Sequence, residues 1–152
     1  YNKNKRIRQK VTHLMKVDLK ELAAAFAQSD VRQGYVDTAA GKVIMMADDL
    51  AERDAMHYAM VMEEDWERYI SIPNIMDEDE TAMMHAFAAS RPREDVKERL
   101  FESLKGAGAV TRFCRQVRHL LLKPAWESFK QDYLIQAARD WCEENAVEYR
   151  EP

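Results

Sequence analysis

The sequence has few cysteines, few glycines and no long apolar run. Its two cysteines, Cys114 and Cys142, lie in helical patterns and fit reduced core thiols in a cytosolic protein, with a disulfide as the alternative. No apolar run approaches the ~20 residues that a membrane-spanning helix needs. The basic N-terminal stretch is followed by no apolar segment, so we predict no signal peptide. We therefore expect a cytoplasmic protein with no membrane partner.

Strong catalytic and metal-binding motifs are also missing. The four histidines, at positions 13, 57, 85 and 119, have no partner at metal-ligand spacing, and neither cysteine pairs with one of them. On a helix, a separation of five residues places Cys114 and His119 about 140° apart, which argues against a nucleophilic pair. No Asp-x-Asp loop with a following glycine is present, so no calcium loop is predicted. We predict no catalytic residue, no metal and no cofactor.

What the sequence does contain is an ordinary globular composition with unevenly distributed charge. A chain of 152 residues, 47% hydrophobic and 33% charged, is long enough for one domain with its own core. The net charge is −4, but residues 48–80 hold twelve acidic side chains and two arginines, a net of −10. Residues 91–123 carry a net charge of +5, and residues 3–20 a net charge of +6. This segregation predicts a dipolar surface suited to a polyanion or an acidic partner, although solvated helix faces are the simpler explanation.

Residue patterns in the first half predict helices that alternate with a small antiparallel sheet. Asp18, with Glu21 three residues later, marks the start of a first helix whose apolar stripe includes Leu22 and Phe26. A β-hairpin is expected over residues 34–46 with its turn at Gly41, and a third strand over 68–73. Between them, Asp48 and Asp49 are expected to cap a second helix that continues toward Trp66, and Asp77 is expected to cap a third.

The second half predicts three further helices. Pro92 suits the first position of one helix, and Gly106 is expected to end it as a left-handed cap. The next helix is predicted over residues 109–122, with Phe113, Val117 and Leu121 on its buried face. Pro124 starts the last helix, for which two tryptophans lie in the apolar stripe. Altogether the sequence predicts an α+β fold that is mostly helical, with five or six helices and a small antiparallel sheet made of a hairpin and one strand.

Two segments of different character are expected along the chain. Residues 1–16 form a basic N-terminal arm or a remnant of cloning, and residues 17–149 form a single α+β domain. As a native arm, the first segment would bind nucleic acid non-specifically through its phosphates.

The two closely spaced glycines, Gly106 and Gly108, mark the first candidate site. The N–H groups at a helix N-terminus favour an anion, and nearby cations would add to that preference. The residues of this anion-binding hypothesis are Lys105, Gly106, Gly108, Ala109 and Arg112. The alternative is a tight corner between two helices, in which Gly106 caps the first helix and Gly108 permits close packing. No strand precedes the turn and no lysine-serine pair follows it, so a nucleotide-binding loop is not predicted.

A basic face on the following helix is the second candidate. It comprises Arg112, Arg115, Arg118, His119 and Lys123. This face could contact a nucleic acid backbone, an acidic protein, or the acidic segment of another copy in a homo-oligomer. No aromatic residues are interleaved on it for base stacking, so sequence-specific recognition is not supported.

Several short motifs, taken in order, resemble one known family. They are Tyr35-Val36-Asp37 with Gly41-Lys42-Val43, Arg68 to Pro73, Gly106-Ala107-Gly108-Ala109 with Arg112-Phe113, and Trp126, Phe129, Ala138 and Trp141-Cys142. Together they resemble the bacterial uncharacterised protein family UPF0158, from about Val17 to Glu148. The sequence departs from the family pattern after Phe113, where Cys114 and Arg115 replace a lysine and an acidic residue. Because the family has no established activity, the resemblance implies a fold and a bacterial origin but no mechanism.

The leading hypothesis for function is a non-enzymatic interaction module whose partner is a polyanion or an acidic protein. It is motivated by the segregated charge. The alternative is an enzyme that acts on a phosphorylated small molecule at the turn from Gly106 to Arg112.

Overall fold

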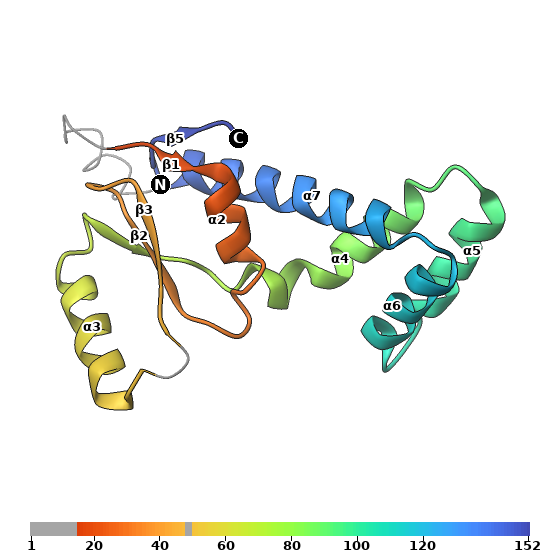
Figure 1. Cartoon of the computed structure of the whole chain (residues 1–152), viewed down its shortest axis with the longest axis horizontal. Coiled ribbons are helices and arrows are strands. Elements are labelled where there is room, and N and C mark those ends of the chain that lie inside the picture. Colours follow the sequence, from red (N-terminus) through yellow and green to blue (C-terminus); the bar gives the residue numbers. More distant parts are fainter. Residues whose placement is uncertain (1–14, 48–49) are drawn as a thin grey trace. The chain divides into compact units, whose positions relative to one another are not determined.

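The computed structural model describes residues 15–47 and 50–152 (Figure 1). Within these residues it contains six helices and five short strands, which confirms the predicted α+β fold. The strands form a three-stranded antiparallel sheet in the order β3-β2-β4 and a separate parallel pair, β1-β5. Most of the predicted N-terminal arm and the predicted caps Asp48 and Asp49 lie outside the described residues. None of the described helices combines the length and the apolar character that a membrane crossing requires.

The chain divides into two compact units. One comprises the described residues before Asp77 together with Leu134–Pro152, and the other comprises Asp77–Tyr133. Helices α4 (Ile75–Ala89) and α7 (Lys123–Glu144) each contribute residues to both units. That residues 17–149 form a single domain stays a prediction.

The first unit begins with a parallel strand pair and a capped helix. Strand β1 (Val17–Asp18) pairs with β5 (Tyr149–Arg150), a pairing that the sequence did not predict. Helix α2 (Leu19–Phe26) starts at the predicted cap, because Asp18 Oδ1 accepts hydrogen bonds from the backbone N–H groups of Lys20 and Glu21 at 2.8 and 3.4 Å. The predicted stripe is buried, with Leu22 and Phe26 fully covered.

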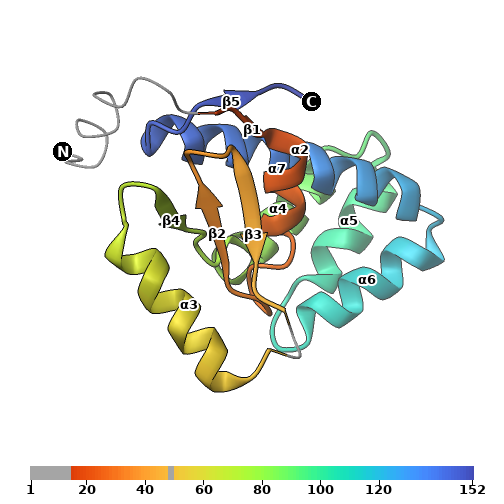
Figure 2. The same ribbon diagram turned by 60° about the vertical axis from the view of Figure 1, so that its left-hand side comes forward.

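The predicted hairpin is confirmed as β2 (Gly34–Asp37) and β3 (Lys42–Met45). Gly41 in its turn has a φ of +65°, where glycine is favoured. Strand β4 (Tyr69–Ser71) pairs with β2, so β2 is the central strand and all four of its residues are buried. Strand β3 contacts α2, and Figure 2 shows the two elements side by side.

A partly buried ion pair joins the end of β2 to the residue before β4. The Arg68 guanidinium donates from Nε and Nη2 to the two carboxylate oxygens of Asp37, both at 3.0 Å. The N–H groups of Ala39 and Ala40 donate to the same carboxylate at 3.1 and 3.2 Å. Asp37 is only 6% exposed, so these bonds stabilise a charge that water does not reach.

The C-terminal part of α7 completes the core of the first unit. Trp141 packs its ring edge against Phe26, with ring centroids 6.0 Å apart. The helix ends in a Schellman motif, because the Val147 N–H donates to the Cys142 carbonyl at 2.8 Å and Ala146 has a φ of +54°. Both cysteines are free, and burial raises the pKa of the Cys142 thiol to about 12. Cys142 is therefore an inert core residue.

The second predicted helix is α3 (Glu52–Glu64), which begins with Ala51 as its N-cap. Only Met62 of this helix is buried. Four of its other apolar side chains are about half exposed or more: Met56, Tyr58, Met60 and Val61. The sequence therefore predicts the helix but not its largely uncovered apolar surface.

The second unit is built around an aromatic cluster. Phe87 on α4, Phe113 on α6 (Ala109–His119) and Trp126 on α7 meet in edge-to-face pairs, with ring centroids 5.0 to 6.1 Å apart. Phe129 adds a further contact to Phe87 at 5.4 Å. Phe87 and Phe113 are fully buried, so this cluster is the core of the unit.

Three boundary predictions for the second unit are wrong. Helix α4 begins at Ile75, so Asp77 lies in its first turn rather than at its cap. Helix α5 (Glu94–Ser103) has Arg93 as its N-cap, which leaves Pro92 before the helix. Helix α6 ends at His119, and Leu121, predicted on its buried face, is 85% exposed.

Leu121 ends α6 in an uncommon conformation. The Leu122 N–H donates to the Val117 carbonyl at 2.8 Å and the Leu121 N–H to the Arg118 carbonyl at 3.1 Å, which is the Schellman pattern. Its left-handed position holds Leu121 with a φ of +58°, where glycine is usual. A side chain there costs roughly 1 kcal/mol relative to glycine.

Candidate functional site

The candidate site lies in the helical pair α5 and α6, which Figures 1 and 2 show side by side and joined by a short turn. Gly106 and Gly108 in this turn have φ values of +73° and +78°. Gly106 thus has the predicted left-handed conformation, although it lies two residues beyond the C-cap Leu104. A Cβ atom on Gly108 would meet only Arg112 Nη1, at 3.0 Å. The turn therefore needs glycine at position 108 for its backbone conformation and for the neighbouring guanidinium, rather than for close helix packing.

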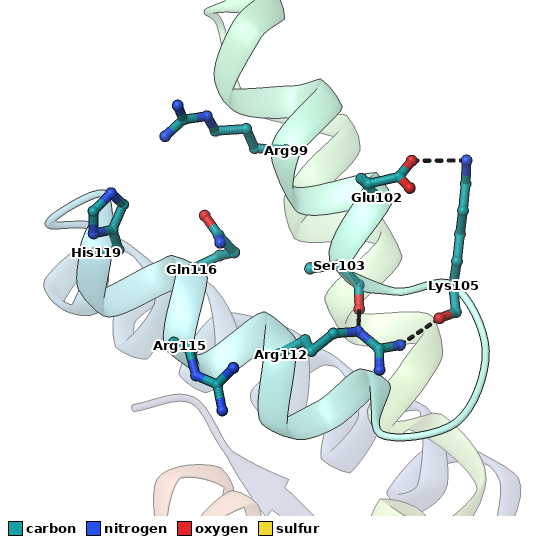
Figure 3. Close-up of a pocket in the computed structure, with 8 residues that line it drawn as sticks. All are labelled: Arg99, Glu102, Ser103, Lys105, Arg112, Arg115, Gln116 and His119. Carbon is teal, nitrogen blue, oxygen red and sulfur yellow. Dashed lines mark hydrogen bonds and ion pairs between the residues drawn. The ribbon is translucent and has the colours of Figure 1, made fainter.

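Arg112 is directed at the backbone of this turn. Its two terminal nitrogens donate to the carbonyls of Lys105, Gly106 and Ala107. Its Nε donates to the Ser103 carbonyl at 3.1 Å, and Figure 3 shows this bond together with the one to Lys105. The carbonyls at a helix C-terminus have no partner within the helix. Arg112 therefore supplies the end of α5 and the following turn with the donors that they lack, and most of its own donors are occupied.

A hollow of about 640 Å³ opens between the two helices. Figure 3 shows Arg99 extending from α5 and Gln116 extending from α6 into the same space. We call this feature the basic hollow. Its lining residues are Arg99, Glu102, Ser103, Lys105, Arg112, Arg115, Gln116 and His119.

Positive charge dominates the basic hollow. Four of its lining side chains are cationic and only Glu102 is anionic. Glu102 pairs with Lys105 at 2.8 Å, and the hydrogen bond from that ammonium group lowers the pKa of the Glu102 carboxyl. Arg99 and Arg115, by contrast, have no carboxylate within ion-pairing distance among the described residues. These two guanidinium groups are the cations that an anionic partner can reach.

An unsatisfied polar atom also borders the basic hollow. The side-chain oxygen of Gln116 is buried and accepts no hydrogen bond from the described part of the chain. A buried acceptor without a donor costs roughly 1–3 kcal/mol.

The structure brings together only part of each predicted set. From the anion-binding set, Lys105 and Arg112 line the basic hollow, whereas Gly106, Gly108 and Ala109 do not. From the basic face, Arg112, Arg115 and His119 line it, whereas Arg118 and Lys123 do not. The sequence did not predict Arg99, Glu102, Ser103 or Gln116. Arg99 and Glu102 are three residues apart on α5, a spacing that places them on one helix face but does not show that α6 lies beside them. No three described histidine, cysteine or acidic side chains lie close enough to share a metal ion.

Replacing Arg112 with alanine is expected to lower the free energy of unfolding by about 1–2 kcal/mol, because several carbonyls lose a charged donor at once. Lysine at this position should rescue little, since a single ammonium group cannot span the turn as the planar guanidinium does. Urea denaturation measures the effect. Arg115→Ala is the matched control and should stay within about 0.5 kcal/mol of the wild type. Equal effects of the two alanine variants would contradict the positioning role of Arg112.

Comparison with known proteins gives one match. Residues 12–151 match the model of the uncharacterised protein family UPF0158. This range contains every element described above and the whole basic hollow. No curated protein and no solved structure matches the chain significantly.

Proposed function

The chain belongs to the uncharacterised protein family UPF0158, and on that premise we propose that it is a non-enzymatic interaction module of the bacterial cytoplasm. Its partner is a polyanion, which it binds through the basic hollow. The observation that carries this proposal is the excess of cations in the hollow, four against one carboxylate that is already paired with Lys105.

An extended partner suits this surface better than a single small anion. Arg115, Arg118 and His119 are all exposed and follow one another along the last turns of α6. Because each residue of a helix rises 1.5 Å, these side chains continue the positive charge of the hollow along the helix. A linear array of negative charges can contact both the hollow and this continuation.

Three of the four hollow cations are arginines, and this favours phosphate as the recognised group. A guanidinium group binds phosphate or carboxylate oxygens through two parallel hydrogen bonds, whereas an ammonium group acts as a point charge. The backbone of a nucleic acid supplies phosphates at regular intervals. We therefore take nucleic acid backbone as the first partner to test and an acidic protein segment as the second.

Fluorescence anisotropy with labelled single-stranded nucleic acid tests the proposal. The double variant Arg99→Ala, Arg115→Ala should bind about tenfold more weakly than the wild type, since two charged contacts are worth about 1.4 kcal/mol together. Arg53→Ala, an exposed arginine on α3, is the matched control and should leave affinity close to that of the wild type.

Parallel titrations separate the partner classes. If labelled polyglutamate binds more tightly than nucleic acid at equal ionic strength, the partner of the hollow is an acidic protein. If a phosphorylated small molecule binds tightly and neither polymer does, the result favours an enzyme at the turn from Gly106 to Arg112 instead. Wild-type binding that is absent, or that the double variant leaves unchanged, would refute the proposal.

A further inference from the structure

A second, smaller hollow lies in the other compact unit, between α3 and β4. Its volume is about 210 Å³, and it is lined by Tyr35, Met62, Glu63, Trp66, Tyr69, Ile70 and Ser71. Aromatic and aliphatic side chains make up most of this lining, in contrast to the cations of the basic hollow. We call it the aromatic hollow. Its size suits one branched aliphatic side chain.

The aromatic hollow is bordered by apolar side chains, by Glu63 and by the Arg68 guanidinium, which lies over the Tyr69 ring and is paired with Asp37. Helix α3 carries the exposed side chains Met56, Tyr58, Met60 and Val61. Its sequence holds four acidic residues and one arginine, a net charge of −3. Glu63 lines the hollow itself, and its charge, after the larger effect of burial, raises the pKa of Tyr35. A large apolar patch with a charged rim is typical of an interaction surface.

The chain also carries a strongly exposed apolar side chain among basic neighbours. Leu121 projects from the end of α6 with 85% of its surface exposed. Its left-handed φ of +58° strains the backbone, and its exposed side chain makes no core contribution that offsets the strain. Arg118, His119 and Lys123 are within three residues of it and are exposed. Leu121 is thus an exposed apolar side chain with basic residues close to it in the sequence.

We propose that Leu121 of one copy inserts into the aromatic hollow of a second copy of this chain. The insertion removes an exposed leucine from water and places Arg118 and Lys123 beside the acidic rim that includes Glu63. Apolar and charged parts of the two surfaces therefore match at the same contact. Reciprocal exchange of this contact between two copies gives a symmetric dimer. This self-association goes beyond the proposed binding of a polyanion, for which Arg99 and Arg115 in the basic hollow are the central contacts.

Light scattering coupled to size-exclusion chromatography, across a concentration series of the full chain, tests the proposal. The wild type should show a mass that rises from monomer to dimer. Leu121→Asp should raise the dimer dissociation constant by about tenfold or more, because burial of a leucine is lost and an acid faces the acidic rim. Val31→Asp, which changes another exposed aliphatic residue (75% exposed), is the matched control and should dimerise as the wild type does.

Two further variants separate docking from a merely structural role. Leu121→Gly relieves the backbone strain, so in dilute solution its melting temperature should rise by about 2–4 °C, while its dimerisation weakens. Ser71→Trp fills the aromatic hollow from an exposed strand position and should weaken dimerisation without touching Leu121. The exchange Glu63→Lys with Arg118→Glu should restore part of the association that either single reversal loses.

A wild type that stays monomeric at every concentration overturns the proposal. So does a dimer that neither Leu121→Asp nor Ser71→Trp weakens, because a different surface would then hold it. Arg99→Ala with Arg115→Ala should leave the mass unchanged, so failure of self-association and failure of polyanion binding are distinguishable.

Discussion

Replacing Trp126 with alanine is expected to lower the free energy of unfolding by about 3–5 kcal/mol, the usual range for removing a large aromatic side chain from a core. Trp126 is 7% exposed, and its ring lies 5.0 Å from that of Phe113 and 5.3 Å from that of Phe87. The substitution removes two edge-to-face contacts and leaves a cavity at the centre of the unit. Loss of this much stability is a large fraction of what a domain possesses.

Urea denaturation followed by circular dichroism measures this loss. Trp66→Ala is the control, since Trp66 is 42% exposed and its removal should cost clearly less. Trp141→Ala should resemble Trp126→Ala, because Trp141 is 9% exposed and packs on Phe26 in the other unit. If Trp126→Ala unfolds at the same urea concentration as the wild type, the aromatic cluster is not the core of its unit.

Replacing Asp37 with asparagine is the second large effect that we expect, with a loss of about 2–3 kcal/mol. Breaking a buried ion pair typically costs 3–5 kcal/mol, and the half-exposed Arg68 side chain (44%) places this pair somewhat below that range. Asparagine keeps an oxygen for the N–H groups of Ala39 and Ala40 but removes the charge that Arg68 neutralises. The central strand β2 then loses its attachment to the start of β4.

The same pair gives the stability a defined pH dependence. Burial by itself raises the pKa of Asp37, but the hydrogen bond and charge of Arg68, with the two N–H groups, outweigh it and hold the pKa below its ordinary value. The stabilisation by the ionised carboxylate is therefore present above about pH 4 and is lost as the pH falls through the folded-state pKa.

Urea denaturation of the wild type and Asp37→Asn at several pH values between 7 and 3 checks this sign. The difference in unfolding free energy between the two proteins should be largest at neutral pH and should shrink in acid. A difference that is constant over this range would show that Asp37 does not stabilise the fold through its charge.

Local sequence signals predicted much of the fold, because they act between neighbours. Asp18 caps α2 through N–H groups two and three residues away, and Gly41 permits a turn within one hairpin. Signals of this kind can be recognised in a single sequence, because they do not depend on contacts with distant residues.

Contacts between distant residues could not be predicted in this way. Asp37 and Arg68 are 31 positions apart, and β1 pairs with β5 across nearly the whole chain. The periodic pattern of α6 predicted Leu121 on a buried face. The helix instead ends at His119, and the left-handed backbone conformation of Leu121 leaves its side chain exposed to solvent. Helical periodicity describes a residue only while the helix continues.

The same limit applies to the candidate site, where single residues were predicted from the sequence but their spatial neighbours were not. Arg112 was identified from the sequence, yet its partners, the carbonyls of the preceding turn, became visible only in the structure. Arg99 joins Arg115 because α5 and α6 pack together, and no spacing in the sequence relates the two residues. The cations that we expect to meet a partner are therefore partly different from those first predicted.

The basic hollow is tested most directly by the salt dependence of nucleic acid binding. Each phosphate contact contributes about one unit to the slope of log Kd against log salt concentration. The double variant Arg99→Ala, Arg115→Ala should therefore show a slope about two units smaller than the wild type, while Arg53→Ala keeps the wild-type slope. An identical slope for the wild type and the double variant would contradict polyanion binding at this site.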